Sequence, residues 1–449
     1  MSAVWDRLSL DAKAVGLVAT FNAVALVFSH TTLQATRDDL VWRLFPGIVG
    51  PLWLALCFAL ALAYPLRDLR GAEAFTPRRR WAHLAAIVVV FAVLPTIAAI
   101  VLRETGKPYT YVHDGAIMIE EAARKLIAGH DPYVADYLDT PLYFWPMVNN
   151  PALYHLTYFP FLFLVTTPFV ALFDRIGAFW DQRYLYLPAY LATLAVLPAL
   201  VPTNAQRLAL VALVGLNPQL FPFVIEGRND FFVLLFLFAG IALIQRERRT
   251  LGTLMVALAG AAKLHALILL PFLAVYLVAT RRPRTLRRAW SALWRPGWPA
   301  VLVLAVTFVP FIVWEPFAIY DDVVQYNAGG AAWSYPISGM GFGAILLALG
   351  VIPHRQADFP FAVVEALVAA PLALYFLRRL WSRPRIATML LGYSITLLAF
   401  LFFGRYFQGN YLGFIVAIAT PVLFLVERGA VRRAGRVTGA TAAAATPAE

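Results

Sequence analysis

Apolar runs recur along the 449-residue chain, most of them about 18 to 22 residues long, the length that an α-helix needs to cross a bilayer. Charged residues make up only 14% of the chain, against about 25% in soluble domains, and the mean hydropathy is +0.71. Because a segment in lipid must satisfy its own backbone hydrogen bonds, these runs predict helices. The sequence therefore predicts an all-α integral membrane protein.

The expected spans number about 11 to 13. They lie at residues 12–30, 48–66, 82–102, 155–173, 183–201, 206–224, 230–245, 250–280, 298–314, 341–352, 360–378, 386–403 and 411–426. Residues 1–81 hold two extra N-terminal spans and a basic loop, and residues 82–426 form one membrane domain. Residues 427–449 form a basic and then low-complexity tail that we expect to be disordered.

The net charge of +12 is explained by topology. Arginines gather in short loops that flank apolar runs, which is the positive-inside pattern of cytoplasmic loops. These loops lie at residues 67–80, 246–249, 281–288, 378–385 and 428–436. A nucleic-acid groove would interleave basic and aromatic residues, and the sequence has no such stretch, so we expect no nucleic-acid partner. The single Cys57 rules out an internal disulfide framework and a thiolate metal site.

Two segments do not fit simple counting of spans. Residues 250–280 lie between two basic loops, and about 31 residues are too few for two full crossings. We expect two short helices that meet near residues 260–266 and line a polar cavity. Parity between residues 103 and 246 also requires one run not to cross, and we favour 155–173, which Pro160 and Pro168 interrupt.

A polar segment at 111–133 follows the span at 82–102, on the non-cytoplasmic side. From Gly115 to Ala128 its apolar residues fall on one helical face, while Glu120 and Glu121 fall on the other, which we expect to be solvated. Gly129 is placed to end this helix. The sequence predicts an amphipathic helix that lies flat at the outer interface.

Asp114 stands immediately before this expected helix. Aspartate is a favoured N-cap residue, so Asp114 needs no other role. Alternatively, Asp114 is a general base held at the membrane surface. One residue can do both.

Lys263 is a lone lysine in an apolar run, and His265 follows it. An intramembrane lysine is costly unless it reaches the interface by snorkelling, or faces a cavity or an anion. The two readings of Lys263 are therefore snorkelling and binding of a lipid-linked phosphate. Arg228 and Asp230 stand at the mouth of another span, where Asp230 could merely cap the next helix and Arg228 could merely pair with an acid.

Further candidates lie in the other external segments. The loop at 314–343 combines acids with aromatic residues, and Arg405 lies in the short segment 404–410 on the same side. Tyr154 and His155 in "NPALYHLTYFPF" are further candidates for substrate or phosphate binding. His113, Asp114, His130 and Asp131 suggest a metal site, but a helix stop and turn explain Asp131 better, so we expect no metal ligands there.

The order of these motifs resembles the GT-C superfamily of polyprenyl-phosphate-sugar-dependent glycosyltransferases. It is most similar to bacterial glycosyltransferase family 87 and related mannosyltransferases, over roughly residues 82–426. The motifs that carry the resemblance are "YVHDGAI", "AGHDPY", "NPALYHLTYFPFLFLVTTPF", "LNPQLFPFVIEGRND" and "ALAGAAKLHALILLPF". The two leading spans have no clear counterpart in the family.

The resemblance implies a GT-C-type helical bundle and carries the family's proposed general base over to Asp114. Its G-x-x-D element corresponds to Gly227 to Asp230, with Arg228 where glutamine is common. Its A-x-K element corresponds to Ala262 and Lys263. The implied reaction moves mannose or another sugar from a polyprenyl phosphate to an acceptor hydroxyl, with inversion. Lys263, His265, Arg228 or Arg405 would stabilise the leaving phosphate.

The implied location is the bacterial cytoplasmic membrane, with the site on its external face. The expected partners are membrane lipids, a polyprenyl-phosphate-linked sugar and a glycan, glycolipid or protein acceptor. We expect no cofactor, although a divalent metal stays possible. Two alternatives remain open: a lipid or polyisoprenoid transporter or flippase, which predicts midplane charges in two related halves, and a non-catalytic assembly factor.

Overall fold

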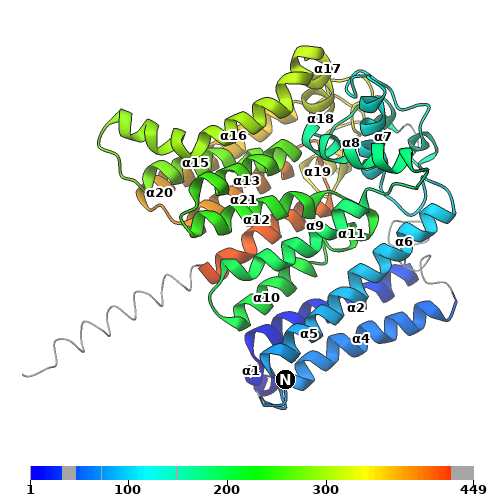
Figure 1. The fold of residues 1–449 in the computed structure, drawn as a ribbon, viewed down its shortest axis with the longest axis vertical. Coiled ribbons are helices and arrows are strands. Elements are labelled where there is room, and N and C mark those ends of the chain that lie inside the picture. The colour runs from blue at the N-terminus through cyan, green and yellow to red at the C-terminus, as the bar shows by residue number, and fades with distance from the viewer. Residues whose placement is uncertain (1, 33–46, 72, 148–149, 426–449) are drawn as a thin grey trace, which may run out of the picture.

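A computed structural model describes residues 2–32, 47–71, 73–147 and 150–425, and the predicted tail at 427–449 lies outside them. The described chain is mostly helical (Figure 1). Its helices include five that are long and apolar enough to cross a membrane: Val49–Asp68, Pro77–Thr105, Arg183–Leu200, Leu286–Trp314 and Phe361–Ser382. Five further apolar helices are 10 to 17 residues long. The chain is thus an all-α, multi-pass membrane protein.

The N-terminal helices belong to the same apolar core as the rest. They are α1 (Ser2–Arg7), α2 (Leu10–Thr32) and α4 (Val49–Asp68), followed by α5 (Pro77–Val88), the π-helical turn η1 (Val89–Val93) and α6 (Leu94–Thr105). Arg80 of α5 pairs with Asp11 and Asp68, and Asn22 of α2 donates to the Leu216 carbonyl. Buried polar contacts therefore join α2 and α4 to the remaining helices.

The next helices are α9 (Arg183–Val196), the 3-10 turn η4 (Leu197–Leu200), α10 (Asn204–Gly215), α11 (Pro222–Glu226) and α12 (Asp230–Gln245). The expected span at 206–224 is interrupted: α10 ends at Gly215 and the chain turns before α11, although the segment as a whole runs from Asn204 beside Trp81 to Glu226 beside His113. Pro218 lacks an N–H for a continuing helix, and the Asn217 side chain accepts from the Gln219 N–H to close the turn.

The expected break between two short helices near 260–266 is confirmed. Helix α13 (Arg249–Ala262) ends at Lys263, whose backbone is extended, and α14 (Leu264–Leu267) and α15 (Leu269–Ala279) return. The break places Lys263 between the C-terminus of α13 and the N-terminus of α14.

The C-terminal part contains α16 (Leu286–Trp314), α19 (Phe342–Ala348), α20 (Phe361–Ser382), α21 (Ile386–Phe402) and a last helix, Gly409–Leu425. The expected span at 341–352 is wrong, because the seven residues of α19 extend only about 10 Å. Gly350, at φ +71°, lies just after α19, where the chain leaves the helix. Along α16 large apolar side chains such as Val306 and Val313 are exposed, as expected of a face toward lipid.

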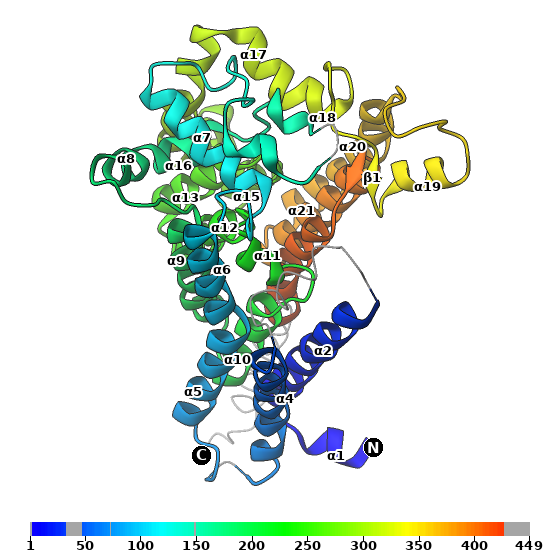
Figure 2. The ribbon, with the colours of Figure 1, turned by 90° about the vertical axis from the view of Figure 1, so that its right-hand side faces the viewer.

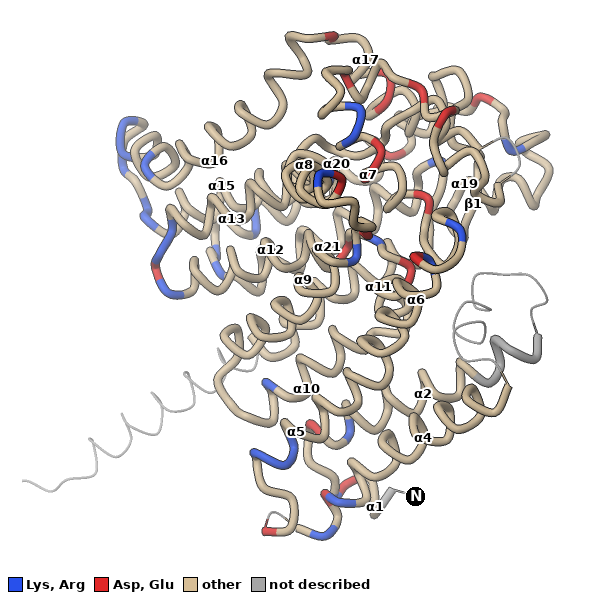
Figure 3. The backbone as a smooth tube through the Cα atoms, turned by 45° about the vertical axis from the view of Figure 1, so that its right-hand side comes forward, with Lys and Arg blue, Asp and Glu red and all other residues tan. Residues whose placement is uncertain are grey.

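The short elements gather at one end of the molecule, to the right in Figure 1 and toward the viewer in Figure 2. They are α7 (Asp114–Ile127), η2 (Pro141–Phe144), η3 (Pro151–Leu153), α8 (Pro160–Arg175), α17 (Pro316–Tyr320), η5 (Asp321–Gln325) and α18 (Tyr326–Ala328). A short parallel pair, β1 (Ser338–Gly339) with β2 (Tyr406–Phe407), lies near them. Figure 3 shows acids concentrated at this end and lysines and arginines at the opposite ends of α12, α13 and α15.

The 155–173 run forms α8, which begins only at Pro160 and packs along α7. It is not among the helices long and apolar enough to cross. This agrees with the parity argument that one run in this region does not cross.

Candidate functional site

Helix α7 begins at Asp114 and carries it at the edge of a cavity. The sequence had suggested Asp114 as the N-cap, but the N-cap is His113. His113 has the extended backbone, and its Nδ1 accepts from the Gly115 N–H. Asp114 Oδ1 accepts from the same N–H and lies 2.7 Å from His113 Nδ1. As expected, the helix stops at Gly129, whose φ of +82° suits glycine.

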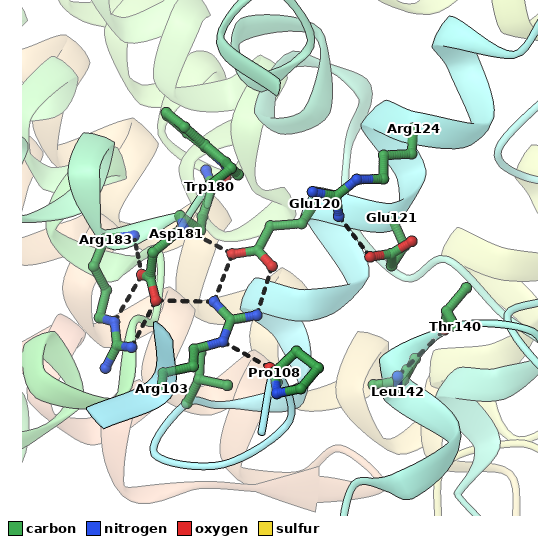
Figure 4. Close-up of polar contacts among 12 residues, drawn as sticks. Arg103, Pro108, Glu120, Glu121, Arg124, Thr140, Leu142, Trp180, Asp181 and Arg183 are labelled. Atoms are coloured by element: carbon green, nitrogen blue, oxygen red, sulfur yellow. Dashed lines mark hydrogen bonds and ion pairs between the residues drawn. The ribbon is translucent and has the colours of Figure 1, made fainter. Parts of the chain in front are cut away.

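A buried network of four charged residues fixes α7 (Figure 4). Arg103 donates to both carboxylate oxygens of Glu120, at 2.9 and 2.7 Å, and to Asp181 at 2.9 Å. Arg183 closes the network with two bonds to Asp181, at 2.8 and 2.7 Å. We call Arg103, Glu120, Asp181 and Arg183 the saturated cluster, because no buried side-chain nitrogen or oxygen in it lacks a partner.

The expectation that Glu120 and Glu121 form a solvated face is therefore wrong. Their residues are 2% and 8% exposed, because α6 and the segment before α9 pack against this side of α7. Arg124 pairs with Glu121 at 2.7 Å. Burial raises the pKa of Glu121, and Arg124 opposes that rise. The helical periodicity identified two faces, but both contact protein.

Arg183 also ties the segment before α7 to the turn before α12. Its Nη1 donates to the carbonyls of Tyr111 and Ile225, at 2.7 and 2.9 Å. The His113 N–H donates to the Glu226 carbonyl at 2.8 Å. These bonds bring Asp114 beside the turn at 226–230, which is distant in sequence.

The turn at 226–230 needs its glycine. Gly227 has φ +83°, and a Cβ there would lie 3.1 Å from the Arg183 side chain. Asp230 then starts α12, but its carboxylate is not an N-cap: Asn229 holds that position. The Asp230 oxygens instead accept from Lys263 at 2.5 Å and from Asn410 at 3.0 Å.

Lys263 does not snorkel to an interface. Its Nζ points to Asp230 and also donates to Asn229 at 3.1 Å, and its side chain is 14% exposed. Arg228 extends the group, since its Nε donates to Glu226 at 3.0 Å and its Nη1 to Asn410 at 3.2 Å. We call Arg228, Asp230, Lys263 and His265 the open cluster.

The open cluster and Asp114 line one cavity of about 830 Å³. Six of the eight residues singled out in the sequence lie around it: Asp114, Arg228, Asp230, Lys263, His265 and Arg405. One wall of this cavity is an apolar face of α20, made of Ala362, Ala366, Ala369, Ala370 and Ala373. The cavity thus joins a charged end to a wall of small apolar side chains.

Two buried nitrogens of the open cluster have no hydrogen-bond partner. They are Arg228 Nη2 and His265 Nδ1. The Arg228 side chain is only 9% exposed, and its guanidinium lies over the Phe223 ring, 4.1 Å from the centroid. A buried guanidinium donor without an acceptor is costly, so this end of the cavity suits an anionic ligand.

Arg405, Tyr154 and His155 are placed differently. The Arg405 guanidinium donates to three backbone carbonyls, of Tyr335, Ala357 and Arg355, which explains its burial without a ligand. Tyr154 stacks on Trp333 outside the cavity lining. His155 faces Asp322 at 2.7 Å, also outside the lining.

Asp131 and His130, which had suggested a metal, lie in and beside a turn, although the second carboxylate oxygen of Asp131 is buried without a hydrogen-bond partner. Asp131 Oδ1 accepts from the Tyr133 N–H in the turn after α7, and His130 is exposed. Among the described residues, a group of His, Asp or Glu ligand atoms within 4.8 Å of one another occurs instead at His155, Asp321 and Asp322.

The sequence reasoning did not assign roles to several cavity residues. His113 contacts Asp114, and Asn410 contacts Asp230. The Tyr158 hydroxyl lies so close to Gly115 that a Cβ on residue 115 would be 2.0 Å from it. Glu365 of α20 also lines the cavity. It is the single acid inside the 360–378 run. An isolated acid in an apolar run is costly, so the sequence could have marked Glu365 as a functional candidate.

The surroundings of His113 disfavour its charged form. Burial lowers its pKa, and the positive charge of Arg228 lowers it further, against the opposing effect of Asp114.

No protein-family model matches the chain, and no curated protein matches it. The resemblance to the GT-C superfamily therefore stays a hypothesis that rests on the order of motifs.

Proposed function

We propose that the chain is an inverting membrane glycosyltransferase that uses a polyprenyl-phosphate sugar as donor. The observation that carries the proposal is the cavity itself. It combines a carboxylate (Asp114), cations with a buried unpartnered donor (Arg228 and Lys263) and an apolar wall from α20. A lipid-linked phosphosugar has the matching parts: a hydroxyl-reactive anomeric carbon, an anion and an apolar chain.

In the proposed step the acceptor hydroxyl oxygen attacks the anomeric carbon. Asp114 takes the hydroxyl proton as the new C–O bond forms. The bond between the anomeric carbon and the phosphate oxygen breaks, and that oxygen keeps the electron pair. The products are the glycosylated acceptor, with inverted configuration, and a polyprenyl phosphate.

The open cluster would bind the leaving phosphate. Arg228 Nη2 and the Lys263 ammonium are donors that act on the developing negative charge, and they are held in place by Glu226, Asn410 and Asp230 before the reaction. Both cations are paired with a carboxylate, but Arg228 keeps a buried donor without a partner, Nη2, so Arg228 would be the stronger phosphate ligand.

By the positive-inside rule, the acidic end would face the outside of a bacterial cytoplasmic membrane. The acceptor would then be an external glycan, glycolipid or protein. A transporter would place its charges near the midplane in two related halves, and the sequence shows no such halves.

The test is transfer of radiolabelled sugar from a panel of polyprenyl-phosphate donors by the purified full chain. Asp114→Asn should lower the rate by about 10² to 10⁴-fold, the usual contribution of a general base. Asp136→Asn is the matched control, because Asp136 is exposed in the same external segment. Full activity of Asp114→Asn on a donor that the wild type uses would remove the proposed base.

A further inference from the structure

His155, Asp321 and Asp322 form a group of potential metal ligands outside the cavity lining. His155 Nδ1 lies 2.7 Å from Asp322 Oδ1 and 3.7 Å from Asp321 Oδ2. His155 comes from the segment before α8, and the two acids come from η5. The group therefore joins two segments that are about 166 residues apart in sequence.

The His155 ring is oriented as in metal sites. Its Nε2 lies 2.5 Å from the Ala332 carbonyl, which is an acceptor, so the proton belongs on Nε2. When Nδ1 is deprotonated, its lone pair faces the two carboxylates. Metal-bound histidines usually donate their other ring N–H to a carbonyl or carboxylate in this way.

The carboxylates are also held. Asp322 Oδ2 accepts from the Leu156 N–H at 2.8 Å, which leaves Oδ1 facing His155. The side chains of His155 and Asp322 are 7% and 4% exposed, whereas that of Asp321 is 39% exposed. Two ligands are thus buried, and the third lies at the surface, where a water can complete the coordination.

The three ligand atoms lie within 4.8 Å of one another, close enough to bind one cation. A proton on His155 Nδ1 would satisfy Asp322, but Asp321 at 3.7 Å is beyond hydrogen-bond range. Tetrahedral Zn²⁺ bonds of about 2.0–2.2 Å place ligand atoms about 3.3–3.6 Å apart, between the two observed distances. A divalent metal would use all three groups.

We propose that His155, Asp321 and Asp322 bind a divalent transition-metal ion of the Zn²⁺ type. One imidazole and two carboxylates suit such an ion better than Mg²⁺ or Ca²⁺, which prefer oxygen ligands alone. Both neighbouring segments line the cavity, through Thr157 and Tyr158 on one side and Val323 and Tyr326 on the other. The metal would clamp these segments together and has no part in the proposed sugar transfer.

The test is zinc binding by the full chain in detergent, after chelator treatment and dialysis. Metal content is measured by inductively coupled plasma mass spectrometry, and affinity by competition with a chromogenic chelator. The wild type should bind one Zn²⁺ per chain, and Asp321→Asn should weaken binding by at least ~10-fold, as for disturbed metal sites. Asp321 is the gentler variant because its side chain is partly exposed, and His155→Gln should act the same way.

Asp136→Asn should bind zinc like the wild type, since it removes an external carboxylate elsewhere. Asp114→Asn should also bind zinc normally while losing sugar transfer, so the two proposals can fail separately. A wild type that binds no zinc, or an Asp321→Asn variant that binds it equally well, would overturn the metal site. The cation between the acceptors would then be a proton.

Discussion

The two buried charged clusters each combine arginine with aspartate, and they differ in how completely they are bonded. In the saturated cluster, Arg103 and Arg183 direct their donors at Glu120, Asp181 and backbone carbonyls. In the open cluster, Arg228 Nη2 and His265 Nδ1 have no partner and border a cavity. Burial of charge is common to both, so incomplete bonding is what distinguishes a candidate binding site from a structural network.

The carboxylate of Asp181 shows how self-contained the saturated cluster is. Burial alone would raise its pKa, but Arg183 and Arg103 outweigh burial and lower the pKa of Asp181. The cluster is ionised through its own contacts and requires no ligand. Its function is to hold α7, and with it Asp114, against α6 and α9.

The largest expected effect comes from breaking the saturated cluster. Arg103→Leu leaves Glu120 without its bidentate partner in a buried site, which should cost about 3–5 kcal/mol of unfolding free energy. The measurement is denaturant unfolding of the purified protein in micelles. Lys125→Leu is the control, since Lys125 of the same helix pairs with Asp139, whose side chain is 72% exposed, and such surface pairs contribute about 0–1 kcal/mol. Equal losses for the two variants would contradict the comparison.

The next effect should appear in ligand affinity. Arg228→Lys keeps the charge beside Glu226 but removes the forked guanidinium and its unpartnered Nη2. A charge-assisted hydrogen bond is worth about 1.5–3 kcal/mol, so the KM for donor should rise about 10- to 150-fold. Unfolding should stay within about 1 kcal/mol of the wild type.

Arg405→Lys is the matched control for that experiment. Arg405 lines the same cavity, but its donors are already bonded to backbone carbonyls. Its replacement should lower stability more than donor affinity. If Arg228→Lys and Arg405→Lys change donor KM equally, unpartnered donors do not mark the site.

Some of these features could be predicted from the sequence, and the reasons are physical. The break at Lys263 followed from length, because 31 residues between basic loops cannot cross twice as full helices. The gathering of Asp114, Arg228 and Lys263 around one cavity agrees with the order of motifs that carries the resemblance. Apolar length and charge placement are local properties that a sequence displays directly.

Other features depend on tertiary contacts. Helical periodicity placed Glu120 on a polar face, but only the packing of Arg103 and Asp181 decides that this face is buried. The residues 341–352 are apolar enough for a span, yet they form only the short helix α19. A periodic pattern states which residues share a face and leaves open what covers it.

The smallest expected effect concerns His113, whose pKa depends on a charge of the open cluster. Its pKa is lowered from 6.5 by burial and then by Arg228, so the unfolded chain takes up a proton at a higher pH than the folded one. The stability associated with neutral His113 is therefore complete above about pH 6.5 and is lost as the pH falls through the folded pKa. Each unit of lowering is worth about 1.4 kcal/mol.

His113→Asn isolates this contribution, because asparagine is also a good N-cap but does not titrate. The difference in unfolding free energy between the wild type and His113→Asn should be constant above pH 7 and shift against the wild type below pH 6.5. In an Arg228→Gln background the shift should shrink, because one of the two causes of the lowered pKa is gone. A difference that stays flat down to pH 5 would mean that the fold does not lower the pKa of His113. A shift of unchanged size in the Arg228→Gln background would mean that burial alone lowers this pKa and that the charge of Arg228 does not reach His113.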